Sequence, residues 1–405
     1  MTTNQTKASF FGLGIAPGLL SALDALKFTV PTPIQEKAIP IAIEGKDVIG
    51  VAQTGTGKTL AFGIPMAQRI AQGKGRGLVL VPTRELALQV NEDLSKLVRS
   101  FKLRTAVVIG GESMKQQIKQ LKDRPHIVVA TPGRLNDHIE QRGLRLRDIT
   151  ILVLDEADRM LDMGFLPQIE RIIRLLPKER QTMLFSATME ADVLRIASRY
   201  MHLPVRTEIA PSGTAPELVT QEIFFVLKEM KGELLTQLLA QYGGSVLLFV
   251  RTKRSASRVA RLLRGRGFPA AEIHADRTQG QRKDALRRFK TGECRILVAT
   301  DIAARGIDVK AIELVLNYDL PDDVGNYVHR IGRTGRAGVK GHAITLATPD
   351  QRKDVKAIEQ LIHSNIPVSR HPKFSVVEPE QPAALKKPDF GRYPHPSRRL
   401  LRRRR

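Results

Sequence analysis

The stretch from Ala52 to Thr59 reads Ala-Gln-Thr-Gly-Thr-Gly-Lys-Thr and has the residue types and spacing that bind phosphate. It follows an apolar run and matches the pattern G-x-x-x-x-G-K-[ST] except at the first position, where Ala52 replaces glycine. In this pattern the backbone N–H groups of a turn and of the next helix cradle phosphate oxygens. A glycine-rich turn with a chance lysine is the alternative, and the strand-like run before it argues against that.

The pattern assigns a part to each residue of this loop. Lys58 is expected to reach the β- and γ-phosphates, and the Thr59 hydroxyl to bind Mg²⁺. The loop residues expected to bind the nucleotide are Thr54, Gly55, Thr56, Gly57, Lys58 and Thr59.

The acidic motif Asp155-Glu156-Ala157-Asp158 follows the apolar run 150–154, which is typical of a buried strand. Ligands of open α/β sheets bind at the carboxyl ends of the strands. We therefore expect Asp155 to hold Mg²⁺, directly or through water. Glu156 is expected to orient and deprotonate an attacking water molecule. A surface acidic turn is the alternative, and its coincidence with a phosphate loop weighs against it.

Composition indicates a large basic protein. The 405 residues include 65 Lys and Arg against 41 Asp and Glu, a net charge of +24. This surplus favours a polyanionic partner, nucleic acid before membrane. The single cysteine, Cys294, excludes a disulfide framework or thiolate zinc cluster and fits a reducing cytoplasm, so we expect a cytoplasmic protein. No apolar run reaches the ~18 residues of a membrane span, and we expect no membrane partner.

Apolar runs alternate with amphipathic segments in two stretches, which indicates an α/β protein built from βαβ units and parallel sheets. We expect one domain over 1–207, a flexible linker over 208–219, a second domain over 220–368 and a disordered basic tail over 369–405. Strands are expected near 48–52, 78–81, 105–109, 127–130, 150–154 and 182–185, then 222–227, 246–250, 271–273, 295–299, 313–317 and 342–347.

In one-letter code the acidic motif reads DEAD, and from about Phe10 to His342 the chain resembles the DEAD-box RNA helicases. Within that family it resembles the short bacterial RhlE-like members. The resemblance implies two tandem RecA-like domains, each a mainly parallel sheet flanked by helices. It also implies that ATP is the nucleotide. Phe28 and Gln35 look like the adenine-reading motif, in which Phe28 stacks on the base and Gln35 hydrogen-bonds its edge. Lys27 replaces a glycine common there, with little consequence expected.

The resemblance also implies a set of RNA-contacting loops, each placed after a strand. Such loops offer backbone N–H groups, hydroxyls and arginines, which suit phosphate and 2′-OH more than base edges. Singly, each loop would be an ordinary turn; their joint occurrence favours RNA binding. The residues concerned are Pro82, Thr83, Arg84, Gly111, Thr131, Gly133 and Arg134 in the first domain, and Arg251, Gln279, Arg282, Thr300 and Asp301 in the second.

Two further motifs would join hydrolysis to RNA. By resemblance, Ser186 and Thr188 work with Asp158 to couple hydrolysis to strand separation, although a plain helix N-cap is an alternative. Arg333 and Arg336 resemble arginine fingers that reach the γ-phosphate from the second domain.

In the same domain, Gly306 and Asp308 would meet the nucleotide by resemblance, and His274-Ala275-Asp276 departs slightly from the usual His-Gly-Asp.

Together these motifs predict an ATP-dependent RNA helicase that locally unwinds short RNA duplexes or remodels RNA–protein complexes by closure of two domains. A non-processive RNA clamp or annealing factor and a DNA helicase are the alternatives. Ribosome assembly or RNA decay, with partners from those processes, is the expected setting.

The basic tail gives a first testable prediction. Residues 371–405 contain 10 Lys and Arg against 3 Asp and Glu, so they are expected to bind RNA without sequence preference. Deletion of 371–405 should weaken RNA binding and flatten its salt dependence, measured as the slope of log affinity against log salt. An unchanged slope would refute this role.

Overall fold

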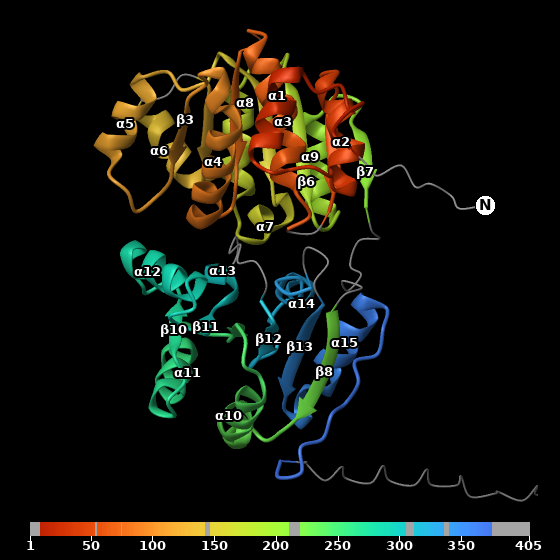
Figure 1. Ribbon diagram of the computed structural model, residues 1–405, viewed down its shortest axis with the longest axis vertical. Helices are drawn as coiled ribbons and strands as arrows, with labels where there is room; N and C mark the ends of the chain where they lie inside the picture. The colour runs from red at the N-terminus through yellow and green to blue at the C-terminus, as the bar shows by residue number, and fades with distance from the viewer. Residues whose placement is uncertain are drawn as a thin grey trace, which may run out of the picture.

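Two parallel β-sheets organise the computed structural model of this chain (Figure 1). It describes residues 9–52, 55–73, 75–141, 146–209, 219–304, 312–335 and 340–374. The first sheet has the strand order β3-β4-β2-β5-β6-β1-β7, and the second has the order β10-β11-β9-β12-β13-β8. Every pairing between the described strands is parallel, which confirms the predicted α/β class with two domains.

Most of these strands lie where the apolar runs predicted them, because a strand covered on both faces needs apolar side chains at nearly every position. In the first sheet they are β1 Val48–Val51, β2 Arg76–Leu80, β3 Thr105–Val108, β4 Ile127–Ala130, β5 Ile149–Asp155, β6 Gln181–Ser186 and β7 Val205–Glu208. In the second sheet they are β8 Val219–Phe225, β9 Val246–Phe249, β10 Ala270–Ile273, β11 Ile296–Ala299, β12 Leu314–Asn317 and β13 Gly341–Ala347.

Helices cover both faces of the first sheet. One face packs against α1 Pro17–Ala25, α2 Pro33–Ile43, α3 Lys58–Ala71 and α4 Arg84–Val98. The other face packs against α5 Met114–Lys122, α6 Pro132–Glu140, α7 Ala157–Asp162, α8 Leu166–Leu175 and α9 Ala191–Tyr200. Alternate residues of each strand enter the two apolar clusters, so the sheet is the central layer of three.

The second sheet is covered in the same way. One face packs against α12 Gln279–Lys290, α13 Asp301–Ala304, α14 Gly325–Ile331 and α15 Arg352–Ile362. The other face packs against α10 Lys231–Gln241 and α11 Lys253–Gly265. Short 3₁₀ turns lie at Arg99–Phe101, Lys228–Met230 and Pro349–Gln351. No helix among the described residues is long and apolar enough to cross a membrane.

Two differences from the sequence predictions concern chain segments at sheet edges. Strand β7 was not predicted, because it lies at the edge of its sheet and of its four residues only Thr207 is buried. The predicted tail begins at residue 369, yet Ser369 N donates to Ile223 O at 2.8 Å and Phe374 is buried. The second domain therefore includes residues up to 374, and the rest of the tail lies outside the described residues.

The two domains meet along a boundary where α7 of the first domain faces α13 and α14 of the second, and α12 of the second domain lies below α4 and α5 (Figure 1). Polar contacts cross this boundary: Arg282 Nη2 lies 2.9 Å from Glu85 Oε1, and His329 Nε2 lies 3.9 Å from Asp158 Oδ2. The structure therefore has the domains in contact.

Candidate ATP and RNA site

The phosphate loop has the backbone that its glycines predict. Gly55 and Gly57 have φ values of 86° and 89°, in the left-handed region that favours glycine, and Gly57 is the N-cap of α3. Lys58 is the first residue of that helix and is buried, with its Nζ donating to Ala52 O at 3.1 Å. The same Nζ lies 3.9 Å from Asp155 Oδ1, so the lysine is already aimed at the acidic motif. Thr54 lies outside the described residues.

Gln35, predicted to read adenine, holds the phosphate loop in this structure. Its Nε2 donates to Gly57 O at 2.9 Å, and its Oε1 accepts from Thr32 N at 2.9 Å. A Cβ at Gly57 would lie 2.3 Å from Gln35 Nε2, so the glycine makes room for this amide. Each amide atom keeps a second hydrogen or lone pair for a base. Phe28 is 42% exposed, which leaves its ring face open for stacking.

Lys27, which precedes Phe28, has a φ of 62°. This left-handed conformation favours the glycine that is common at the position. The departure from glycine thus has a backbone cost, where little consequence was expected.

The acidic motif turns sharply as it leaves the sheet. Asp155 is the last residue of β5, and Glu156 has a φ of 54°, uncommon for a residue with a side chain. Glu156 N donates to Asp155 Oδ1 at 3.0 Å, and Arg159 Nη1 donates to Glu156 Oε2 at 2.9 Å. All three side chains are buried. This left-handed residue places two carboxylates side by side at the carboxyl end of β5. Backbone strain of this kind clusters at functional sites.

The two carboxyl groups differ in proton affinity. Burial raises the pKa of Asp155 to about 6, although the Lys58 charge works against it. Burial also acts to raise the pKa of Glu156, but the charges of Arg159, Lys58 and Arg333 together outweigh it and lower this pKa to about 2. Glu156 is therefore an anion throughout the physiological pH range.

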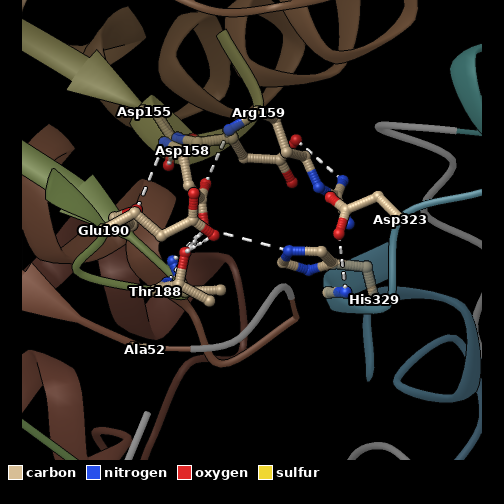
Figure 2. A network of polar contacts seen from close by, with 12 residues as sticks. Ala52, Asp155, Asp158, Arg159, Thr188, Glu190, Asp323 and His329 are labelled. Carbon is tan, nitrogen blue, oxygen red and sulfur yellow. Dashed lines mark hydrogen bonds and ion pairs between the residues drawn. The ribbon is translucent and has the colours of Figure 1, made fainter. Parts of the chain in front are cut away.

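Asp158 connects the acidic motif to the loop after β6 (Figure 2). Its Oδ2 accepts from Ala187 N and Thr188 N, both at 2.9 Å, and from Thr188 Oγ1 at 3.2 Å. Its own N–H donates to Ser186 Oγ at 3.2 Å. The two hydroxyls predicted to couple hydrolysis thus both contact Asp158. Since the N-cap of α9 is Glu190, neither Ser186 nor Thr188 is the N-cap residue of that helix.

Residues of the second domain approach this cluster from across the boundary. Figure 2 shows the His329 ring directed at the Asp158 carboxylate, with Nε2 3.9 Å from Oδ2. Burial lowers the pKa of His329, so the ring is neutral at pH 7. Arg333 is buried beside it and is close enough for its charge to lower the pKa of Glu156. The predicted partner finger Arg336, with Gly306 and Asp308, lies outside the described residues.

Arg330 has a structural position that sequence reasoning missed. Its Nε and Nη2 donate to the two carboxylate oxygens of Asp301 at 2.5 and 2.6 Å, and its Nη1 donates to Asp319 O at 2.6 Å. The guanidinium is buried over the Phe249 ring, 5.1 Å from its centroid. The carboxylate of Asp301, which was predicted to face RNA, is therefore paired with Arg330. The signal available in the sequence was the three-residue spacing of Arg330, Arg333 and Arg336.

The predicted RNA residues of the first domain gather at one place. Thr83 caps α4 by accepting from Leu86 N at 3.2 Å, and Arg84 lies against the two glycines at 110–111. A Cβ on Gly111 would lie 2.1 Å from Arg84 Nη1, so a side chain there would displace the end of the arginine from its present position. Arg134 Nη2 donates to Glu112 O at 3.0 Å, which joins the third loop to the second.

Two predicted RNA residues of the second domain contact the first domain. Arg282 Nη2 lies 2.9 Å from Glu85 Oε1, and Gln279 Nε2 donates to Glu112 Oε1 at 3.3 Å. Lys283 Nζ also lies 3.3 Å from Glu112 Oε1. Sequence reasoning missed Glu85, Glu112 and Lys283, because the partner of a charged surface residue is not visible in a single sequence.

The remaining predicted RNA residues lie where strands give way to helices. Thr131 is the N-cap residue of α6, and the space beside Gly133 is open to a further group. Arg251 Nε lies 3.0 Å from Asp322 Oδ1 on the surface of the second domain. Pro82 precedes the cap of α4, and Thr300 directly precedes α13.

Comparison with known proteins agrees with this site. The family model for DEAD/DEAH box helicase matches residues 32–196, and the helicase conserved C-terminal domain matches residues 230–338. The ATP-dependent RNA helicase CshA of Listeria monocytogenes is 47% identical over 88% of this chain and 69% of its own. The ATP-dependent rRNA helicase RRP3 of Debaryomyces hansenii is 43% identical over 91% of this chain and 78% of its own.

Two solved structures share the whole two-domain arrangement. S. cerevisiae Dbp5 bound to RNA and ADP BeF3 has a TM-score of 0.82 at 32% identity, covering 89% of this chain and 95% of that one. Mss116 bound to ssRNA and UDP-BeF has a TM-score of 0.81 at 29% identity, covering 89% of this chain and 79% of that one. The chain therefore belongs to the DEAD/DEAH box helicase family, and it is an ATP-dependent RNA helicase with two RecA-like domains.

A third solved structure has higher sequence identity to this chain but a lower structural similarity. The DEAD box protein of Methanococcus jannaschii is 38% identical over 89% of this chain and 99% of its own, but its TM-score is only 0.54. The present structure is therefore more similar over its whole length to the two proteins bound to RNA and nucleotide than to this relative of higher sequence identity.

The Arg330 contacts predict a large effect on stability. Arg330→Ala would leave the Asp301 carboxylate without its two strongest donors, and removing one partner of a buried ion pair costs about 3–5 kcal/mol. We expect the free energy of unfolding of the second domain to fall by about this amount in urea denaturation. Arg266→Ala is the control, because its pair with Glu233 is half exposed and should change stability by less than about 1 kcal/mol. Equal losses in the two variants would contradict this account.

Proposed function

We propose that this chain hydrolyses ATP in a site whose charges are divided between two domains, and that RNA promotes the closure that completes it. The observation that carries the proposal is the buried cluster of Lys58, Asp155 and Glu156, which Arg333 approaches from the second domain. The first domain supplies the phosphate loop and the acidic motif. The second supplies the positive charge for the transition state.

The oxygen atoms near the carboxyl end of β5 and the start of α3 fit a magnesium ion. Asp155 and Thr59 offer hard oxygen ligands, which Mg²⁺ prefers. Within the described residues, no group of three or more His, Cys, Asp or Glu side chains is placed to hold a metal, so the remaining ligands would come from phosphates and water. When bound, the ion would neutralise charge between the β- and γ-phosphates.

Each residue of the proposed nucleotide site would have a different role. Gln35 and Phe28 would read and stack the adenine, and Lys58 would contact the β- and γ-phosphates. Glu156, whose carboxylate is ionised at physiological pH, would orient the attacking water and accept its proton. Arg333 would stabilise the charge that spreads over the transferring phosphoryl group, a contribution of roughly 10³ to 10⁵ in rate. Arg336, Gly306 and Asp308 remain predicted members of this site.

Closure would couple the two ligands. Moving a two-state equilibrium from 1:99 to 99:1 needs about 5.5 kcal/mol of differential binding, which ATP and RNA can share when both favour the closed form. Each then raises the affinity for the other. Unwinding would accordingly be local: closure displaces a few base pairs, and hydrolysis reopens the domains. The predicted alternative, an RNA clamp with little unwinding, is not favoured, because the relatives compared above are named ATP-dependent RNA helicases.

Finer assignments remain predictions. We propose that the first domain ends with β7 at Glu208 and that the second begins with β8 at Val219 and continues to about residue 374, with the predicted linker between the two strands. The rRNA in the name of RRP3 supports structured ribosomal RNA as a substrate and ribosome assembly as the setting, with RNA decay as the alternative. The RhlE-like type and a cytoplasmic location are also predictions, since the relatives compared above are named CshA and RRP3.

The role of Glu156 has a direct test. Glu156→Gln should keep ATP and RNA binding but reduce RNA-stimulated phosphate release by at least about a hundredfold, because the amide orients water poorly. Phosphate release and equilibrium binding of a fluorescent nucleotide would be measured side by side. Glu92→Gln is the control, since Glu92 pairs with Lys96 on the exposed surface of α4 and should change turnover little. Normal phosphate release from Glu156→Gln would sink the assignment.

The overall function is tested by duplex unwinding. Short RNA and DNA duplexes of the same sequence would be compared with ATP and with a non-hydrolysable analogue. We expect ATP-dependent strand separation of RNA, and little of DNA, because the predicted contacts include 2′-OH groups. RNA-stimulated hydrolysis without strand separation would favour the clamp, and equal activity on DNA would contradict the RNA assignment.

A further inference from the structure

Helix α11 carries three arginines on one exposed face. Arg254, Arg258 and Arg261 are spaced four and three residues apart, which places them on one side of a helix. All three are exposed, whereas the opposite side of the helix, with Val259 and Leu263, is buried against the second sheet. We call these three arginines the α11 stripe.

The stripe differs from the other basic residues around it, which have acidic partners. Lys253 Nζ lies 2.8 Å from Asp276 Oδ1, Arg264 Nη2 lies 3.7 Å from Glu272 Oε1, and Arg266 Nη2 lies 3.4 Å from Glu233 Oε2. Across the described parts of the chain, no carboxylate lies within the 4.0 Å of an ion pair of any stripe arginine. The charge of the stripe is therefore left for an external anion.

The arrangement works against the stability of α11. Like charges three or four residues apart repel each other on a helix surface. Lys253 and Arg254 also stand in the first turn, where the helix dipole favours acidic residues and α11 has none. An anion bound along this face would reduce both the repulsion between the arginines and the unfavourable interaction with the helix dipole. The arginines are therefore better explained by ligand binding than by a contribution to folding stability.

The stripe begins near the predicted RNA contacts and leads away from them. Thr252, the N-cap of α11, follows Arg251, and the Lys253–Asp276 pair joins this end to the loop before α12. The other end of α11 lies by α10, far from the domain boundary (Figure 1). Arg254 and Arg261 are seven residues apart, a distance of about 10 Å along the helix.

We propose that the α11 stripe binds the phosphate backbone of RNA that continues past the predicted RNA-binding loops at the domain boundary. This inference rests on the proposed function, since RNA bound at those loops is the polyanion that would reach this end of α11. Exposed arginines spaced along one face of a helix suit phosphate contacts, which carry no sequence information. The stripe would thus give longer RNAs additional affinity without adding selectivity.

The experiment uses the full chain with Arg254→Gln, Arg258→Gln and Arg261→Gln combined. The matched control combines Arg171→Gln, Arg174→Gln and Arg199→Gln, three exposed arginines of α8 and α9 that each have a carboxylate partner. Affinity is measured over a range of salt for oligouridylates of about 6 and about 20 nucleotides, since single-strand sites cover about 4–16 nucleotides. A triple Arg→Lys variant tests whether charge alone suffices.

For the longer RNA, the Gln stripe variant should lose affinity and its salt slope should fall by about 2, at ~0.7 per phosphate contact. Binding of the short RNA and the ATP hydrolysis that it stimulates should not change, and the Lys variant should bind the longer RNA as the wild type does. An unchanged slope in the Gln variant, or an equal loss in the α8/α9 control, would overturn the proposal. Absence of any RNA stimulation in the wild type would instead overturn the proposed function.

Discussion

Three carboxylates buried within four residues, Asp155, Glu156 and Asp158, must have their negative charge balanced. Buried charges are tolerated only when they are paired or hydrogen-bonded. Lys58 and Arg159 supply part of the balance from the same domain. The rest of the charge field comes from the second domain, chiefly Arg333. The acidic motif is thus more fully neutralised when the domains are in contact, which supports the proposal that its chemistry depends on closure.

Asp158 links this electrostatic requirement to the rest of the protein. Its carboxylate accepts hydrogen bonds from the backbone N–H groups of residues 187 and 188, and it faces His329 across the domain boundary. At the loops predicted to bind RNA, Arg282 and Gln279 contact Glu85 and Glu112 of the first domain. The domains are therefore in contact both at the acidic motif and at these loops. A ligand at either end can bias the same closure, which is the physical content of coupling.

Local patterns predicted much of the fold. Apolar runs located the buried strands, and glycine spacing located the phosphate loop, because both depend on neighbours in the chain. The edge strand β7 escaped because three of its four residues are not buried and leave no apolar run. The start of the tail was misread because Ser369 and Phe374 are fixed by distant parts of the second domain.

The site was predictable in its residue types but not in all its contacts. Lys58 and Asp155 meet as the motifs implied. The pairing of Asp301 with Arg330, and the contact of Gln35 with Gly57, depend on tertiary placement that no single motif encodes. The left-handed backbone at Glu156 also had no sequence signal, since glutamate rarely adopts it.

The central claim is that charge delivered by Arg333 joins nucleotide binding to RNA binding. The most direct measurement is the ratio of RNA dissociation constants without and with a non-hydrolysable ATP analogue, in the wild type and in Arg333→Gln. The wild type should bind RNA about 5- to 150-fold more tightly with the analogue, the usual range of such coupling. In Arg333→Gln the ratio should fall close to 1 while RNA affinity without the analogue stays the same. A variant that kept the wild-type ratio would contradict the account.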